Sequence, residues 1–311
     1  MATQPHARAV LAMVGATLLW SVAGVVTRHL HHQDGLDLVF WRSGFAALGV
    51  LVWLLWRQGP RGLARDVRNA SPLLWLSAVF WAVMFTAFMV ALTLTTVAQT
   101  LIADSLSPLI AALLGWLILR HALPARTWLA IMLALIGMGW IAWQNLHHAN
   151  GSTQLLGMLV ALAVPFSAAA NWVSLRRAGV AVPMQAAVML GALFSVAAVA
   201  FPAWPVTVDL HDAIWLAFLG VFQLAIPGLL AVWAAQRLAP AEVGLLGLLE
   251  VVFGILWAWV GAAEQPALGT LIGGGLILLA LVGNEWWGWQ KIKWGARACM
   301  DGYADGEGRS L

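Results

Sequence analysis

Long apolar runs, broken at short intervals by polar or turn-forming residues, cover most of the chain. A helix that crosses the roughly 30 Å hydrocarbon core of a bilayer needs about 20 such residues, and uncharged windows of that length recur along the sequence. The third and fourth runs are hard to separate, because residues 69–103 carry no charge and "LTLTT" is the only break. The predicted segments are residues 9–28, 38–56, 72–93, 96–119, 126–144, 154–174, 184–204, 213–236, 241–261 and 266–286.

These segments predict helices rather than strands. Membrane strands alternate apolar and polar residues over about ten positions, whereas here long stretches are apolar on every face. The first run follows Arg8 like a signal peptide, but it reaches Thr27 without a clear small-residue cleavage site, which favours a retained helix. We therefore expect an all-α integral membrane protein with ten transmembrane helices.

Composition supports a membrane location. The chain is 62% hydrophobic and 9% charged, with a mean hydropathy of +0.87, whereas a soluble domain carries roughly 25% charged residues. Its one cysteine, Cys299, excludes an intrachain disulfide and makes redox chemistry an unattractive function. Residues 291–311 collect Gly and charge, which predicts a disordered cytoplasmic tail.

The positions of Lys and Arg predict the orientation. Placing the N-terminus in the cytoplasm puts fourteen of the sixteen basic residues on that side, leaving out Arg28 and Arg42. Because basic loops stay cytoplasmic, both termini are expected there, in a bacterial-type inner membrane. The net charge of +3 then reflects contact with the lipid bilayer rather than nucleic-acid binding.

An even split gives two five-helix repeats, residues 1–148 and 149–290. An odd number of helices per half makes the second half enter the membrane from the opposite face, so the repeats must be inverted. Sequence support is local: "SLSPLIAALLGWLILRH" (105–121) aligns with "LLEVVFGILWAWVGAAE" (248–264), and this pairs Trp116 with Trp259 and Ser107 with Glu250.

Several motifs resemble those of the drug/metabolite transporter superfamily, EamA type, over about residues 9–286. The matching features are Trp20-Ser21, Arg42, Ser107-Pro108 through Trp116, and Glu264. Departures are Arg120-His121 in place of Gly-Glu, Val251 in place of Pro, and Asp104, which is outside the expected pattern. The resemblance implies export of a small polar metabolite, with amino acids leading, through a central cavity lined by helices 1, 3, 4, 6, 8 and 9.

Two acids stand out as site candidates, because ionisable groups at mid-membrane are costly and usually face a cavity or a partner. Counted from the predicted helix ends, Asp104 and Glu250 both lie near the midplane, about 12–13 Å deep at 1.5 Å per residue. Ser107 shares a helix face with Asp104. Pro108 lacks the N–H that would bond the Asp104 carbonyl, so we expect that carbonyl to be free. Protonated structural acids are the alternative.

The same reasoning extends to other helices. Pro227 should free the carbonyl of Gln223, a buried amide that packing alone explains equally well. Trp20 and Trp81 lie too deep for an aromatic belt, so they either pack in the core or face a substrate. The family resemblance adds Ser21 and Asn171 as cavity candidates, against a role in helix packing.

The remaining polar features predict structural roles. Arg42 is shallow enough to snorkel outward, although its family match leaves a structural ion pair open. "HLHH" (29–32) and "LHH" (146–148) lack further ligands, so neither a metal site nor a cofactor is expected. Gly269 and Gly273 predict a close-packing face, with homodimerisation through it as an alternative.

Three functions fit an all-helical membrane chain with buried acids. A secondary transporter with alternating access is favoured, since no phosphate-binding glycine loop points to ATP use. The transporter would be proton-coupled if Asp104 or Glu250 changes protonation on exposure to water. Two acids also favour a substrate that carries a cationic group, such as an ammonium, a guanidinium or a polyamine. An intramembrane aspartyl enzyme lacks a suitable motif around Asp104, and a non-transporting scaffold would not need acids at matched depth.

Overall fold

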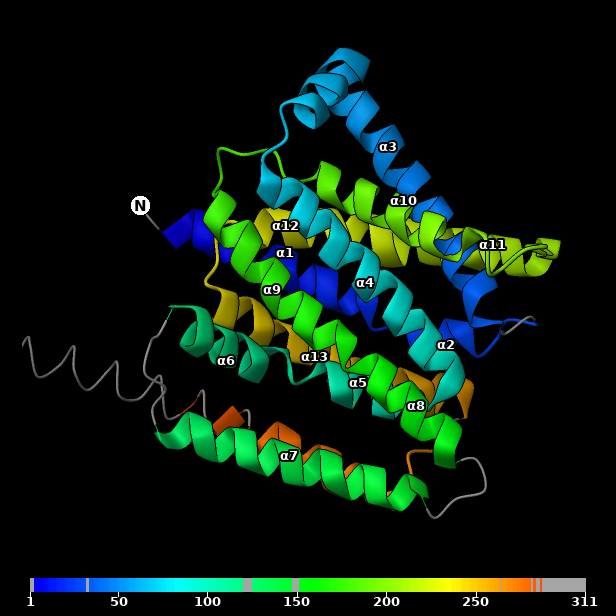
Figure 1. Ribbon diagram of the computed structural model, residues 1–311, viewed down its shortest axis with the longest axis vertical. Coiled ribbons are helices and arrows are strands. Elements are labelled where there is room, and N and C mark those ends of the chain that lie inside the picture. Colours follow the sequence, from blue (N-terminus) through cyan, green and yellow to red (C-terminus); the bar gives the residue numbers. More distant parts are fainter. Residues whose placement is uncertain are drawn as a thin grey trace, which may run out of the picture.

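The computed structural model describes residues 3–31, 34–119, 125–146, 151–263, 265–280, 282–283 and 286, and within these residues it is helical with no strand. The helices run roughly side by side (Figure 1). They are α1 (Thr3–Trp20), α2 (Ala23–Thr27), α3 (Gly35–Arg68), α4 (Pro72–Leu94), α5 (Val97–Asp104), α6 (Ser107–Leu119), α7 (Ala125–Leu146), α8 (Gly151–Ala161), α9 (Ala163–Ala178), α10 (Ala186–Ala200), α11 (Leu210–Phe218), the π-helix η1 (Leu219–Ala225), α12 (Ile226–Ala235) and α13 (Pro240–Ala262), followed by an apolar helix over Leu268–Ala280.

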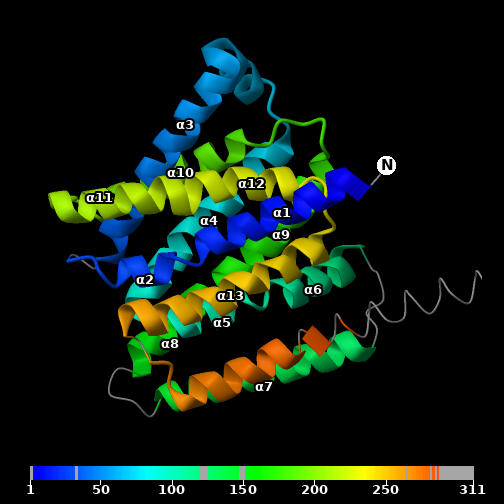
Figure 2. The same cartoon turned by 180° about the vertical axis from the view of Figure 1, so that it is seen from behind.

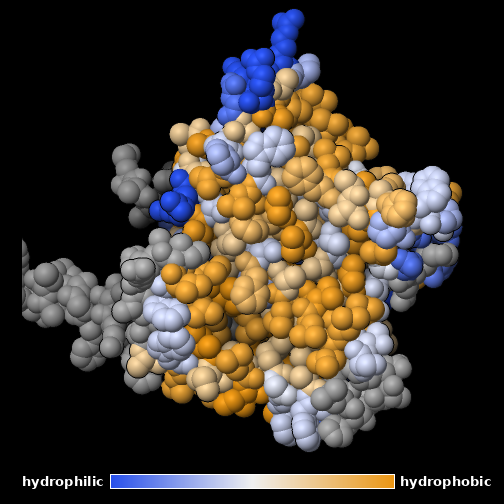
Figure 3. Space-filling model, in the orientation of Figure 1, coloured by the Kyte–Doolittle hydropathy of each residue, from blue (hydrophilic) through white to orange (hydrophobic). Residues whose placement is uncertain are grey.

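Each predicted segment coincides with a helical region, so the all-helical membrane class is confirmed. Among the described residues, eight helical regions are long and apolar enough to cross a membrane, while α10 and Leu268–Ala280 are shorter apolar helices. Ten crossings and an inverted repeat therefore stay predictions. Much of the surface is apolar, as a lipid-facing surface requires, and Figure 3 shows it as broad hydrophobic areas on the visible face.

Four of the crossing segments are interrupted, three near their middle and the first near its end. Breaks separate α1 from α2, α5 from α6, and α8 from α9, and the widened η1 separates α11 from α12. Three of these breaks have a proline within the next turn, namely Pro108, Pro165 and Pro227. A proline removes one helical hydrogen bond and crowds the preceding turn, so these prolines place irregular backbone at depth within the bundle.

The second predicted segment, 38–56, is too short. Helix α3 runs from Gly35 to Arg68 and has a kink at Gly59. Gly59 has a φ of 72° and directly precedes Pro60. The long part before the kink slants away from the bundle in Figure 1, and the short part beyond it turns back at the top, in the hydrophilic area at the top of Figure 3. The apolar pattern stops at the kink because this last part carries basic residues instead.

The helix over Leu268–Ala280 packs along α7 at one edge, as Figure 2 shows from behind. A Cβ added at Gly273 would meet the Gly137 carbonyl oxygen at 2.7 Å and Ile141 at 2.6 Å, and one at Gly269 would meet Gln144 at 2.8 Å. The predicted glycine face is therefore a close-packing face, used within the chain. Homodimerisation stays a prediction without support from this face.

Candidate functional site

A cavity lies where the interrupted helices meet. Its walls come from α1, α3, α4, α9, η1 and α13 and from the α5–α6 break. The lining includes six predicted site residues and one predicted helix-breaker: Trp20, Trp81, Asp104, Ser107, Pro108, Gln223 and Glu250. The fold thus brings together side chains that are up to 230 positions apart in sequence.

Two carboxylates face this cavity from different halves of the chain. Asp104 is the last residue of α5, and Glu250, which is 8% exposed, lies within α13. Both line the same cavity. The Ser107 hydroxyl donates to the Asp104 backbone carbonyl at 2.9 Å and lies 3.4 Å from its Oδ1. The predicted free carbonyl of Asp104 is therefore wrong, because Ser107 replaces the donor that Pro108 lacks.

Arg42 is the third charged group on the cavity wall, and it does not snorkel outward as expected. It is 1% exposed, in α3. Its Nη2 donates to the Phe85 carbonyl at 2.8 Å and its Nη1 to Gln223 Oε1 at 3.3 Å, while Nε has no hydrogen-bond partner. None of the ion pairs among the described residues includes Arg42. A buried guanidinium held only by neutral groups is well suited to an anionic ligand group.

Three tryptophans and a phenylalanine form an aromatic wall. Trp81 is fully buried, and its ring centroid lies 5.8 Å from Trp172, 6.3 Å from Trp20 and 5.3 Å from Phe85. The Trp81 indole N–H has no hydrogen-bond partner. Tilted and edge-on packing leaves ring faces that can accept a cation or an apolar group. Trp20 and Trp81 thus pack against other rings and also line the cavity, and their contact with a substrate stays a prediction.

Gln223 connects the charged and aromatic parts of the wall. It accepts the bond from Arg42 and its Nε2 donates to the Trp20 carbonyl at 3.4 Å. It lies in η1, where the Ile226 N–H bonds the carbonyl of Val221, five residues back. A π-helical turn ahead of Pro227 widens the helix at this point, and such turns are frequent at functional sites.

Three predicted residues lie away from the cavity lining. The Ser21 hydroxyl donates to the Leu18 carbonyl at 2.7 Å and accepts from Trp257 Nε1 at 3.2 Å. Asn171 is fully buried and its Oδ1 accepts from Ser77 at 2.6 Å. These contacts join α1 to α13 and α4 to α9, which is the helix-packing reading of both residues. Pro227 acts only through the backbone of η1.

Sequence reasoning missed Arg42 and Trp172 as cavity residues. The signal for Arg42 was its family match, which is a better guide here than the few residues that separate Arg42 from the predicted helix end. Trp172 directly follows Asn171 in a helix with a stripe of small polar residues. The depth of Trp172 within that helix could have indicated that it lines the cavity. The cavity also draws on the second predicted helix, through Arg42, in addition to the six helices that the resemblance implied.

A many-helix membrane protein with a central cavity that carries both signs of charge has the architecture of a small-molecule transporter. The model of the EamA-like transporter family matches residues 7–143 and again residues 155–284. The chain therefore belongs to the EamA-like transporter family, a family of membrane transporters in the drug/metabolite transporter superfamily. The two matches, one in each half, fall on the two predicted repeats.

A solved structure, titled only as the crystal structure of a protein, is similar to this chain with a TM-score of 0.60 and 20% sequence identity. The similarity covers 89% of this chain and 96% of that one, which supports the fold over nearly its full length. No curated protein matches the chain.

Proposed function

We propose that this protein is a secondary transporter that exports a small polar metabolite, most favourably an amino acid or related amine, by alternating access about the central cavity. The observation that carries the proposal is the convergence of Arg42, Asp104 and Glu250 on one aromatic-walled space. An amino acid presents a carboxylate to a guanidinium and an ammonium to a carboxylate or an indole face. The cavity offers all three partners.

The packing at the two ends of the bundle supports alternating access. The lining extends to Val243, near the start of α13, and to Met13, just past the middle of α1. Toward the α2 end the helices touch closely: a Cβ at Gly261 would meet Val25 at 2.5 Å, and one at Gly24 would overlap Val97. With both termini cytoplasmic, as the basic residues predict, this is a state closed on the outer side.

Two variants at the acids and one at the arginine test the proposal in proteoliposomes. We expect uptake or counterflow of a substrate amino acid to fall at least about tenfold in Asp104→Asn, Glu250→Gln and Arg42→Gln, since each loses a charge-assisted bond worth about 1.5–3 kcal/mol. Ser77→Ala, which lies outside the cavity, is the matched control. Equal transport by wild type and all three charge variants would overturn the site.

Export of organic cations is the second candidate, because two carboxylates and three tryptophans outnumber the single guanidinium. Paired substrates separate the two. Arginine and agmatine, or tryptophan and tryptamine, differ only by the carboxylate that Arg42 would bind. An amino-acid transporter should prefer the first of each pair and lose that preference in Arg42→Gln, whereas a cation exporter should prefer the second and gain from the same change.

Proton coupling through Asp104 and Glu250 is a separate part of the proposal. Two carboxylates on the wall of one cavity favour sharing a proton when water is excluded, and exposure to water on either side would let that proton exchange. Transport should then follow an imposed pH gradient in wild type and not in Glu250→Gln. Wild-type transport that ignores the gradient would leave exchange or facilitated diffusion as the mechanism.

A further inference from the structure

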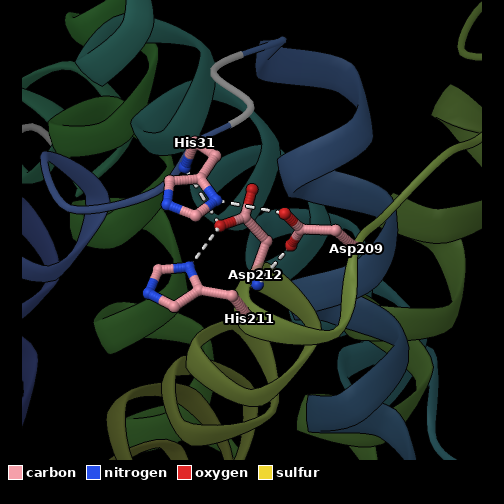
Figure 4. Close-up of side chains that lie close together, drawn as sticks. All are labelled: His31, Asp209, His211 and Asp212. Carbon is pink, nitrogen blue, oxygen red and sulfur yellow. Dashed lines mark hydrogen bonds and ion pairs between the residues drawn. The ribbon is translucent and has the colours of Figure 1, made fainter.

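A second cluster of ionisable groups lies at the α2 end of the bundle, away from the cavity. Figure 4 shows His31, from the segment after α2, facing Asp209, His211 and Asp212 at the start of α11. The possible ligand atoms of these four residues all lie within 4.8 Å of one another. The sequence predicted no metal site because neighbours of "HLHH" offer no further ligands, and the fold supplies them from about 180 residues away.

Hydrogen bonds already orient the carboxylates of this His31 cluster. Asp209 Oδ1 accepts from the Asp212 backbone N–H at 2.7 Å, and Asp212 Oδ1 accepts from the His31 backbone N–H at 3.0 Å. Such bonds behind the ligands fix carboxylates and imidazoles in metal sites. The Asp212 side chain is 1% exposed, so one of the two carboxylates in the cluster is held rigidly in the protein.

The imidazoles complete a mixed nitrogen and oxygen set. His31 Nδ1 lies 3.1 Å from Asp209 Oδ2, and His211 Nδ1 lies 3.0 Å from Asp212 Oδ1. The two rings stack with centroids 4.2 Å apart. Two imidazoles and two carboxylates offer nitrogen and oxygen donors to one divalent cation. Imidazole with carboxylate selects a transition ion such as Zn²⁺ over Mg²⁺ or Ca²⁺.

We propose that His31, Asp209, His211 and Asp212 bind a divalent transition-metal ion of the Zn²⁺ type, which links the two matched halves of the chain at the α2 end. Ligand atoms about 2.0–2.2 Å from such an ion lie roughly 3.3–3.6 Å apart, so the widest pair closes by just over 1 Å. The site lies outside the cavity, and its occupancy does not depend on which substrate the cavity takes.

Zinc binding to the purified, tag-free protein in detergent tests the proposal directly, by equilibrium dialysis or calorimetry at pH 8. The high pH matters because the hydrogen bond to Asp209 raises the pKa of His31, and a proton competes with the ion. We expect one saturable Zn²⁺ per chain, bound at least about tenfold more weakly by His31→Ala and His211→Ala. His29→Ala, an exposed neighbour whose Nδ1 contacts the Val25 carbonyl, should bind as wild type does.

One further variant distinguishes a metal site from a hydrogen-bonded cluster. Trp215 Nε1 donates to His211 Nε2 at 3.2 Å, which keeps the ring proton on Nδ1. Metal binding through Nδ1 moves that proton to Nε2 and breaks this bond, so Trp215→Phe should bind Zn²⁺ up to about fivefold more tightly. Absence of saturable binding, or equal binding by wild type and His31→Ala, would overturn the proposal. His31 is 64% exposed at its side chain, so its loss should not prevent folding.

Discussion

Gly191 provides a test of how the aromatic wall is held in place. It lies in α10 against α4, where an added Cβ would come 2.8 Å from the Ala78 carbonyl oxygen and closer still to the Cβ of Trp81. Both neighbouring atoms belong to or adjoin the α4 backbone, so no side-chain rotation can relieve the contact. Gly191→Ala must therefore push α10 and α4 apart or displace Trp81.

Two opposing terms set the magnitude. Replacing a helical glycine with alanine stabilises a helix by roughly 0.5–1 kcal/mol. Against this, the carbonyl contact must widen from 2.8 to about 3.4 Å, and overpacking of this kind costs about 1–3 kcal/mol. Gly15→Ala in α1 is the matched control, because no atom lies within 4 Å of its added Cβ and only the favourable term applies.

Thermal unfolding in detergent, followed by loss of the monodisperse species, should give opposite signs for the two changes. We expect Gly15→Ala to melt at or above the wild-type temperature and Gly191→Ala to melt below it. Substrate affinity should also fall in Gly191→Ala alone, since Trp81 lines the cavity. Equal melting temperatures for the two variants would refute the tight α4–α10 contact, whatever the transport result.

Other predictions concern contacts outside the cavity. Ser77→Ala should destabilise the protein by about 1–3 kcal/mol, because Asn171 then lacks its partner in a buried site, while the transport KM stays unchanged; a raised KM would return Asn171 to the substrate site. Arg28→Met should lower the melting temperature by removing the donors to the Leu92 and Thr95 carbonyls at the end of α4, both at 2.9 Å, and equal melting would contradict that capping role. Zn²⁺ should slow transport by wild type and not by a His31→Ala variant, as measured in the same proteoliposomes.

The helices and the acids were predictable because their signals are local. A run of about 20 apolar residues in a bilayer forms a helix, because a helix satisfies its own backbone hydrogen bonds. A carboxylate in such a run, such as Asp104 or Glu250, must face something other than lipid. Arg42 was misjudged because its distance from a predicted helix end says nothing of the direction in which its side chain leaves the helix. That direction is set by α4 and η1, which supply Phe85 and Gln223 from far along the chain.

Ser21 and Asn171 show the opposite difficulty. Small polar residues within apolar helices satisfy either a ligand or a neighbouring helix, and the two uses have the same sequence pattern. Here Trp257 and Ser77 take up their hydrogen bonds, which only the packing of α13 against α1 and of α4 against α9 decides. The metal ligands of the His31 cluster were invisible for the same reason, since Asp209 and Asp212 belong to the other half.

The segment from Trp20 to Arg42 connects the cavity with the His31 cluster. It leaves the cavity wall at Trp20, passes through α2 to His31, and returns along α3 to the cavity at Arg42. An ion bound at His31 would tie the middle of this segment to α11, which continues into η1 and Gln223, the residue that bonds Arg42 and the Trp20 carbonyl. Opening the α2 end must separate His31 from α11 or move both together. A metal ion penalises separation, so it should hold the protein in the state closed at that end.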